Sequence, residues 1–346
     1  MHPELQPETI SVHTGNEPDR ATGAVAPPLH LSTTFRHGAD GERIAGYEYQ
    51  REGNPTNDRL REALAALEGG EDALTFASGM AAMTTLLECL PNSARVLIPD
   101  DCYTGLRMLC AEYLPERDIE AIAIDMSDTD AVRTACAQGV AMLWIETPSN
   151  PRMKISDIVA LTDIGHAAGA TVVVDNTFAT PLLQRPLALG ADVVMHSTTK
   201  YFGGHSDVLG GALVFAKKGE LSTRVAHRLH ITGATLAPFS AWLTLRGCRS
   251  LGARMAMHCA NARKVAEFLA SRAEIERVNY PGLPSHPGHA VAMRQMRDGG
   301  GMLSIDSARA RPIDTVLSGP ASGLLAATRV AQAMGQSAII TIDMGG

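Results

Sequence analysis

The amino-acid sequence predicts an α/β protein with a mostly parallel sheet, and three observations support this fold class. Helical and extended patterns alternate along residues 57–216. The extended segments, such as RVLIP at 95–99 and TVVV at 171–174, are short and uniformly apolar. Strands that helices cover on both faces have this pattern. The chain of 346 residues has room for about two domains of ordinary size.

Composition limits the classes of function. Apolar residues make up 45% of the chain and charged residues 19%, as in ordinary globular proteins. The net charge of −7 argues against a nucleic-acid partner, because nucleic-acid binders usually carry a basic excess or patch. No apolar run approaches the ~20 residues of a membrane helix, and the start MHPELQPETI has no signal-peptide pattern. The six cysteines include no Cys-x-x-Cys pair, which favours a reducing cytoplasm over disulfides or structural zinc.

Regular elements follow an N-terminal arm of residues 1–45, which has few periodic apolar positions. Leu60, Leu64 and Leu67 share one helical face, and Gly69-Gly70 ends that helix. The other helices are expected at 81–90, 104–112, 155–168 and 251–273. Strands are expected at 95–99, 120–125, 140–146, 171–174, 192–196 and 211–216, with a further strand suggested at 301–306.

Polar residues stand directly at the ends of the predicted strands. They are Asp100-Asp101, Glu146, Asp175 and the cluster Ser197-Thr198-Thr199. Ligands of open α/β sheets bind beyond the carboxyl ends of the strands. We therefore expect the functional site at this edge of the sheet.

Lys200 is the candidate reactive residue. It follows an apolar strand within HSTTKYFGGHSD at 196–207, a loop rich in small hydroxyl residues. A lysine amine in such a place can react with an aldehyde to form a Schiff base. Considered alone, Lys200 fits an exposed surface lysine better, because lysine is rarely buried.

The predicted neighbours of Lys200 change this interpretation. Asp175 ends the apolar run TVVVD and needs a cationic partner, because an unpaired buried charge is costly. Ser78-Gly79-Met80 opens a helix whose first N–H groups can hold a phosphate. Ser197 and Thr199 add hydroxyl groups, and Tyr103 offers an aromatic face. Pyridoxal phosphate has a phosphate, an aromatic ring, a ring nitrogen and an aldehyde, and would use all of these residues.

Eight motifs occur in the order in which one enzyme family has them. They are SVHTG at 11–15, PPLHLSTTF at 27–35, YEYQREGNPT at 47–56, FASGMAA at 76–82, IETPSNP at 145–151, VVVDNTFATP at 172–181, HSTTKYFGGHSD at 196–207 and YPGLPSHP at 280–287. On these motifs residues 8–305 resemble the Cys/Met-metabolism family of pyridoxal-phosphate enzymes, which includes cystathionine γ-synthase and the cystathionine lyases. The resemblance implies the fold type I architecture of aspartate aminotransferase, and pyridoxal 5′-phosphate as cofactor.

The resemblance also implies a role for each matching residue. Lys200 matches the lysine that binds the cofactor covalently and moves protons, and Asp175 matches the partner of the pyridine nitrogen. Tyr103 matches the residue stacked on the cofactor ring, and completes the expected catalytic set. The other expected cofactor-binding residues of the same subunit are Ser78, Gly79, Met80, Asn150, Thr177, Ser197 and Thr199.

Part of the active site in this family comes from a second subunit. Tyr49 and Arg51 match a pair that reaches the phosphate of the neighbouring subunit, so the resemblance implies a homo-oligomer, a dimer and usually a tetramer. Glu48 matches an acidic residue beside the substrate side chain in γ-acting relatives, and Asn150 matches a residue near the substrate carboxylate. We expect a small amino-acid substrate, no membrane partner and no metal, because the histidines show no ligand spacing.

The chain departs from the family pattern in two places. Residues 103–107 are one position shorter than the family's Tyr-Gly-Gly-x-x-Arg loop, so no role is assigned to Arg107. After Asp306 the Arg-Leu-Ser-Val-Gly-like run that carries the substrate-carboxylate arginine is missing. Residues 307–346 instead resemble a fragment of the hydantoinase A, acetone carboxylase and 5-oxoprolinase family, with SGPASG at 318–323 and DMGG at 343–346.

These observations predict four segments and one main function. The segments are an arm at 1–45, a cofactor-binding α/β domain at 46–250, a truncated C-terminal domain at 251–306 and an unrelated fused tail at 307–346. The expected function is transsulfuration in the cytoplasm, by γ-replacement or γ-elimination on a homoserine ester or cystathionine. The alternative is a pseudoenzyme that binds the cofactor but turns over amino acids poorly. An ATP-binding tail is a third, minor hypothesis.

Overall fold

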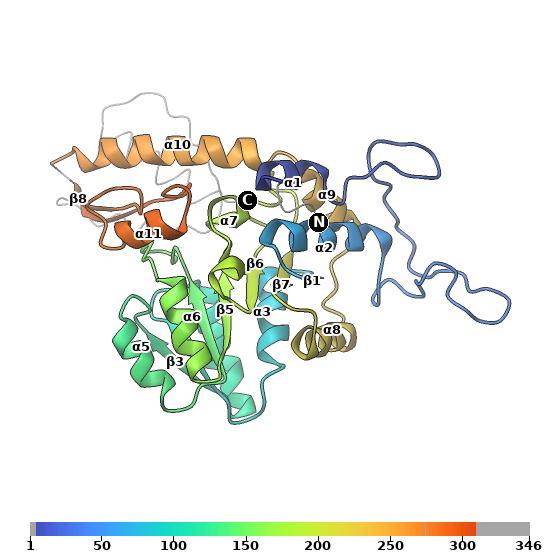
Figure 1. Cartoon of the computed structure of the whole chain (residues 1–346), viewed down its shortest axis with the longest axis horizontal. Helices are drawn as coiled ribbons and strands as arrows, with labels where there is room; N and C mark the ends of the chain where they lie inside the picture. Colours follow the sequence, from blue (N-terminus) through green and yellow to red (C-terminus); the bar gives the residue numbers. More distant parts are fainter. Residues whose placement is uncertain (1–4, 274, 309–346) are drawn as a thin grey trace.

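A computed structural model describes residues 5–273 and 275–308 of the chain (Figure 1). Its centre is a seven-stranded sheet in the order β1-β7-β6-β5-β4-β2-β3. The strands are β1 (Asp72–Phe76), β2 (Arg95–Pro99), β3 (Glu120–Ile124), β4 (Met142–Glu146), β5 (Thr171–Asp175), β6 (Val193–His196) and β7 (Gly211–Phe215).

All strands of this sheet run in one direction except β7, which is antiparallel to both β1 and β6. The predicted mostly parallel sheet is therefore confirmed. Glu146 at the end of β4 pairs with Asp175 at the end of β5, and Asp175 pairs with Met195 of β6. The carboxyl ends of these three strands consequently meet at one edge of the sheet.

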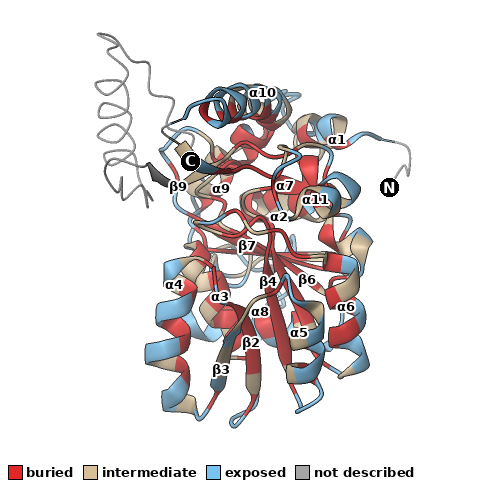
Figure 2. Cartoon of the chain, turned by 90° about the vertical axis from the view of Figure 1, so that its left-hand side faces the viewer, coloured by how far each residue is buried: buried red, intermediate tan, exposed pale blue. Residues whose placement is uncertain are grey.

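Helices cover both faces of the sheet, as the apolar strands predict (Figures 1 and 2). The helices α3 (Gly79–Leu87) and α8 (Glu220–Thr232) pack with Val173, Met195 and Leu213 on one face. On the other face, α5 (Thr129–Cys136) and α6 (Ile158–Ala167) pack against β4 and β5, and α2 (Pro55–Glu68) packs against β6 and β7. Every residue of β4 and β7 is buried, because both faces of these strands contact helices.

The remaining elements lie before, between and after these layers. A two-stranded sheet pairs β8 (Ile275–Asn279) with β9 (Ser304–Ala308). None of the described helices is long and apolar enough to cross a membrane. The other helices are α1 (Pro7–His13), α4 (Thr104–Met108), α7 (Thr180–Leu183), α9 (Pro238–Cys248), α10 (Leu251–Ala270) and α11 (His289–Gln295).

The expected elements recur with small shifts, and several others were missed. The three leucines of α2 are fully buried, and Gly69 ends that helix in the left-handed conformation (φ 80°). The helix expected at 104–112 is wrong in its second half, because α4 ends at Met108 and a π-helical turn follows at Leu109–Tyr113. The sequence analysis missed the strands β1 and β8 and the helices α1, α5, α7, α8, α9 and α11.

Candidate active site

Lys200 lies in the loop that follows β6. The Lys200 N–H donates to the Ser197 carbonyl at 3.2 Å, and the Gly204 N–H donates to the Lys200 carbonyl at 2.8 Å. These bonds fold residues 197–204 into consecutive turns at the end of β6, and Lys200 is half-buried there. Lys200 therefore lies at the sheet edge where the sequence predicts the site.

Asp175 and the Lys200 loop are joined through Thr177. The Asp175 carboxylate accepts the Thr177 N–H at 3.0 Å. The Thr177 hydroxyl oxygen accepts the Ser197 N–H at 2.9 Å. This chain of hydrogen bonds fixes the ends of β5 and β6 relative to each other.

A positively charged group beside Asp175 would stabilise the ionised form of its buried carboxyl group. Its side chain is 6% exposed, and no ion pair of the described residues includes it. Burial raises the pKa of Asp175, while hydrogen bonds from Thr177 and the nearby His196 oppose this rise. A cationic group bound beside Asp175 would relieve the cost of burying its charge.

The N-terminus of α3 faces the same loop. Ser78 caps this helix, because its hydroxyl oxygen accepts the Ala81 N–H at 3.0 Å. A Cβ atom on Gly79 would lie 3.1 Å from Ser197 Cβ, so glycine lets the first turn of α3 approach the Lys200 loop closely. The first N–H groups of a helix have no partner within it and attract anions such as phosphate.

Tyr103 and Asn150 are held at this edge by Glu146. The Glu146 carboxylate accepts the Tyr103 N–H and the Asn150 N–H, each at 2.8 Å. The Tyr103 ring lies near Met80 of α3, because a Cβ atom on Gly105 would come within 2.6 Å of both side chains. The short loop at 103–107 thus needs glycine at position 105.

The Thr199 hydroxyl is engaged with the backbone in this structure. It donates to the Gly210 carbonyl at 3.2 Å and accepts the Gly210 N–H at 3.1 Å. Thr199 therefore fixes the loop before β7, while Ser197 beside it is half-buried next to Gly79.

The residues expected to reach a second subunit lie elsewhere. Tyr49 and Arg51 are exposed, and the Arg51 guanidinium lies 5.1 Å from the centre of the Tyr49 ring. Glu48 pairs with Arg43 on the arm. The segment before α2 projects from the body of the molecule (Figure 1). No hydrogen bond or ion pair of the described residues joins Glu48, Tyr49 or Arg51 to the Lys200 loop.

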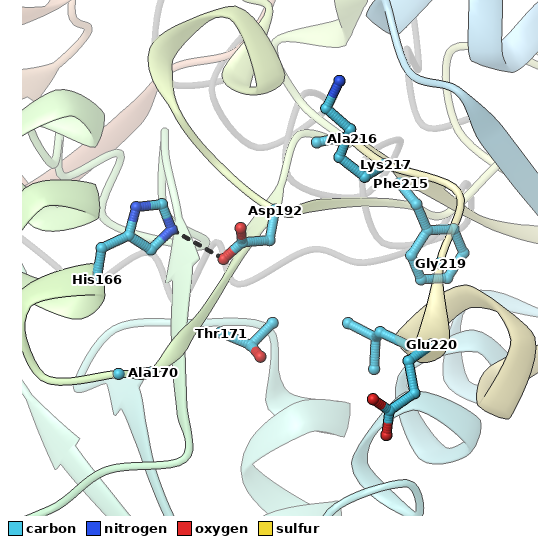
Figure 3. Close-up of a pocket in the computed structure, with 11 residues that line it drawn as sticks. His166, Ala170, Thr171, Asp192, Phe215, Ala216, Lys217, Gly219 and Glu220 are labelled. Atoms are coloured by element: carbon cyan, nitrogen blue, oxygen red, sulfur yellow. Dashed lines mark hydrogen bonds and ion pairs between the residues drawn. The ribbon is translucent and has the colours of Figure 1, made fainter.

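A depression at the opposite edge of the sheet carries different residues. His166, Asp192 and Lys217 line it, and His166 hydrogen-bonds Asp192 at 3.0 Å (Figure 3). It lies where β5 begins and β7 ends, away from the carboxyl ends of β4 and β5. This depression is separate from the Lys200 site.

Comparison with known proteins identifies the family. The profile described as "Cys/Met metabolism PLP-dependent enzyme" matches residues 8–328. The chain belongs to this family. The match extends beyond residue 305, further than the motifs alone suggested. The predicted hydantoinase-like tail lies outside the described residues and stays a prediction.

Similar proteins are cystathionine enzymes. Cystathionine γ-synthase of Mycobacterium tuberculosis is 48% identical over 300 residues, which are 86% of this chain and 77% of that protein. Cystathionine β-lyase of Coxiella burnetii is 42% identical over 86% of this chain and 77% of its own length. The structure of cystathionine γ-synthase from Xanthomonas oryzae pv. oryzae in complex with aminoacrylate and cysteine has a TM-score of 0.85. Its sequence identity is 40%, with 88% of this chain and 79% of that chain covered.

The fold and the site of this Cys/Met-metabolism enzyme fit pyridoxal 5′-phosphate. The α/β architecture is the fold type I arrangement of the family. The capped N-terminus of α3 suits a phosphate, and glycine at position 79 lets this helix end approach Ser197 closely. Buried Asp175 suits a protonated ring nitrogen, and half-buried Lys200 suits an aldehyde.

Glu146 is the residue whose contribution the sequence analysis missed. Its place at the end of a strand was noted, but no role was assigned to it. The signal was a carboxylate at the end of a fully apolar strand, MLWIE, directly beside Asp175 in the sheet. A buried carboxylate in that place needs donors, and the loops of Tyr103 and Asn150 supply them.

Proposed function

We propose that this chain is a transsulfuration enzyme that acts at the γ-carbon of an amino acid. The reaction is γ-replacement or γ-elimination on a homoserine ester or cystathionine, catalysed by a pyridoxal-phosphate-dependent transferase or C–S lyase. The observation that carries the proposal is the joining of Lys200, Asp175 and the α3 N-terminus at one sheet edge. The 48% identity to a γ-synthase favours γ-chemistry over β-elimination.

Each site residue has a task that its position supports. The cofactor, when bound, supplies an electron sink that stabilises negative charge at the substrate Cα. Lys200 Nζ would hold the cofactor covalently, and its free amine would accept the proton from the substrate Cα. The buried Asp175 carboxylate would keep the ring nitrogen protonated through a charge-assisted hydrogen bond.

The surrounding residues bind and orient. The N–H groups of Gly79 and Met80, together with Ser78 and Ser197, hold the phosphate. The Tyr103 ring would stack on the cofactor ring, and the Asn150 side chain would contact the cofactor hydroxyl group and the substrate carboxylate. Thr177 and Thr199 hold the loops of Asp175 and Lys200 in place.

The segment before α2 completes the site of a second subunit in this proposal. Tyr49 and Arg51 are exposed on a projecting segment, which suits contact with a neighbouring copy of the chain. Arg51 then contacts the partner's phosphate group, and Glu48 lies beside the substrate side chain. The assembly is a dimer with two shared sites, or a tetramer of two such dimers.

We also propose the division of the chain into an arm at 1–45, a cofactor-binding domain at 46–250, a smaller domain at 251–306 and a tail at 307–346. The long α10 and the separate β8–β9 sheet support a boundary near residue 250. The tail is proposed to have no activity of its own. Nucleotide binding by a peptide of residues 307–346 would contradict this assignment.

Product analysis tests the proposed function. The purified chain with cofactor is expected to convert O-succinylhomoserine and cysteine to cystathionine and succinate, or cystathionine and water to a 2-keto acid, cysteine and ammonia. The Lys200→Ala variant is expected to lose this activity by at least about 1,000-fold, because one residue serves as both attachment point and base. A chain that binds the cofactor yet turns over neither substrate would instead be the pseudoenzyme of the alternative hypothesis.

A further inference from the structure

Glu146 is a buried carboxylate to which the proposed reaction assigns no task. It ends β4, is 5% exposed and lies beside Asp175 in the register of β4 and β5. Its two oxygens accept from two different loops. Oε2 accepts the Tyr103 N–H and Oε1 accepts the Asn150 N–H, both at 2.8 Å.

We propose that Glu146 is a positioning residue, which fixes the loops of Tyr103 and Asn150 relative to each other at the cofactor site. The inference rests on the proposed function, because the alignment of these loops matters to the reaction only if they contact the cofactor. Tyr103 precedes Glu146 by 43 residues along the chain, and Asn150 follows it by four. One side chain thus joins two segments that the sequence keeps far apart.

A second carboxylate ties the same two loops. Asp101, 6% exposed, accepts the Arg152 N–H at 3.0 Å and the Ser149 hydroxyl. Two ties between the loops fix their orientation as well as their separation. Of these two carboxylates, Glu146 has the more direct link to the candidate site, since its partners are Tyr103 and Asn150 themselves.

The chemistry of Glu146 suits this task better than a role in stability. Burial and the neighbouring Asp175 raise the pKa of Glu146, and the N–H groups of Tyr103 and Asn150 oppose that rise. A second buried carboxylate beside Asp175 is costly, and glutamine would be cheaper to bury. Glutamine, however, replaces one of the two oxygens with an NH2 donor, whereas the two N–H groups bond to different oxygens, Oε1 and Oε2.

The substitution Glu146→Gln in the full-length chain tests the proposal by residue-resolved amide hydrogen exchange, with and without cofactor. We expect exchange at the Tyr103 or the Asn150 amide to become at least about tenfold faster, because a hydrogen bond to a charged group typically contributes that much protection. The cofactor dissociation constant is expected to rise by about tenfold, with a changed circular dichroism band of the bound cofactor. Glu146→Asp, whose shorter side chain cannot span both loops, is expected to change exchange in the same direction.

Glu68→Gln is the matched control. Glu68 is fully buried on α2, and its carboxylate accepts the Asn176 amide and contacts His196, but neither loop. We expect this variant to leave exchange at Tyr103 and Asn150 within about twofold of the original chain, while a general structural effect would speed exchange throughout the sheet. Unchanged protection of both amides in Glu146→Gln and Glu146→Asp, or equal acceleration in Glu68→Gln, would overturn the proposal. If the unsubstituted chain binds no cofactor, the proposed function fails, whereas exchange in the cofactor-free chain still tests the role of Glu146.

Discussion

Asp175 is the residue at which stability and function oppose each other. Burial disfavours its charged form, and Glu146 adds a second buried carboxyl group beside it. No ion pair of the described residues supplies a cation to either carboxyl group. Ionisation of Asp175 is therefore unfavourable in the folded chain, and the proposed contact with the cofactor would relieve this cost.

Asp175→Asn is expected to stabilise the cofactor-free chain at pH 7 by about 1 kcal/mol. The folded-state pKa of Asp175 lies above its unfolded value, so ionisation lowers stability as the pH rises above about 4, and the variant escapes this loss. With cofactor, kcat/KM is expected to fall by about 100-fold, because a charge-assisted hydrogen bond to the ring nitrogen is lost. Thermal unfolding from pH 3.5 to 8 and steady-state kinetics measure the two effects.

Asp128→Ala is a control variant that is expected to lower the stability of the chain, whereas Asp175→Asn is expected to raise it. Asp128 caps α5, and its carboxylate accepts the Ala131 N–H at 3.0 Å. Loss of the cap is expected to destabilise the chain by about 1 kcal/mol. If Asp175→Asn destabilises the cofactor-free chain as Asp128→Ala does, the account of a strained buried charge is wrong.

At this scale the sequence could predict the place of a candidate residue where one residue carries one feature, while the roles of these residues stay predictions. Asp175 and Lys200 stand at strand ends, and the structure joins their loops through Thr177. The contribution of Glu146 could not be predicted, because its donors belong to loops whose approach depends on the order of β2, β4 and β5 in the sheet.

Helix α2 and strand β6 are held together by a fully buried polar contact. His196 Nε2 lies 2.6 Å from Glu68 Oε1, and both side chains are 0% exposed. The same carboxylate oxygen accepts the Asn176 side-chain amide at 2.8 Å, which adds the end of β5 to the contact. This network lies under the strand ends that carry the site.

His196→Ala is expected to destabilise the chain by about 3–5 kcal/mol, because it leaves the Glu68 carboxyl group buried without its histidine partner. His166→Ala is the matched comparison, since His166 contacts Asp192 at 3.0 Å at an exposed position (Figure 3). That substitution is expected to cost less than about 1 kcal/mol. Urea unfolding of both variants gives the two values, and equal values would contradict the assigned importance of the buried contact.

The sequence predicted which segments form most of the strands, but not the direction in which each strand runs in the sheet. Uniform apolar runs identified β2, β4, β5, β6 and β7, because both faces of these strands are covered, whereas the edge strand β3 is only partly buried. The antiparallel direction of β7 could not be predicted from its sequence GALVF, since fully buried strands have the same uniformly apolar pattern in either direction. The helix α8 was missed because its apolar residues are few, with Val225 and Leu229 as its main buried positions.

The whole molecule, in the proposed function, is active only as an assembly. Each site needs Lys200 from one subunit and Arg51 from the other. Lys200→Ala and Arg51→Ala homodimers are therefore both expected to be inactive. A mixed dimer would regain one intact site.

Co-expression of the two variants tests this sharing. Random pairing is expected to restore about a quarter of the original activity, since half of the dimers are mixed and each has one complete site. Each variant expressed alone is the control, and light scattering confirms that dimers form. If the mixture stays as inactive as its parents, Arg51 does not act across subunits.

The covalent attachment of the cofactor tests the central claim most directly. The lysines of the chain are Lys154, Lys200, Lys217, Lys218 and Lys264. Borohydride reduction of the cofactor-loaded chain, followed by peptide mass spectrometry, locates the amine that carries pyridoxal phosphate. We predict one pyridoxyl group, on the peptide that contains Lys200; a label on another lysine, or no label, would contradict the account.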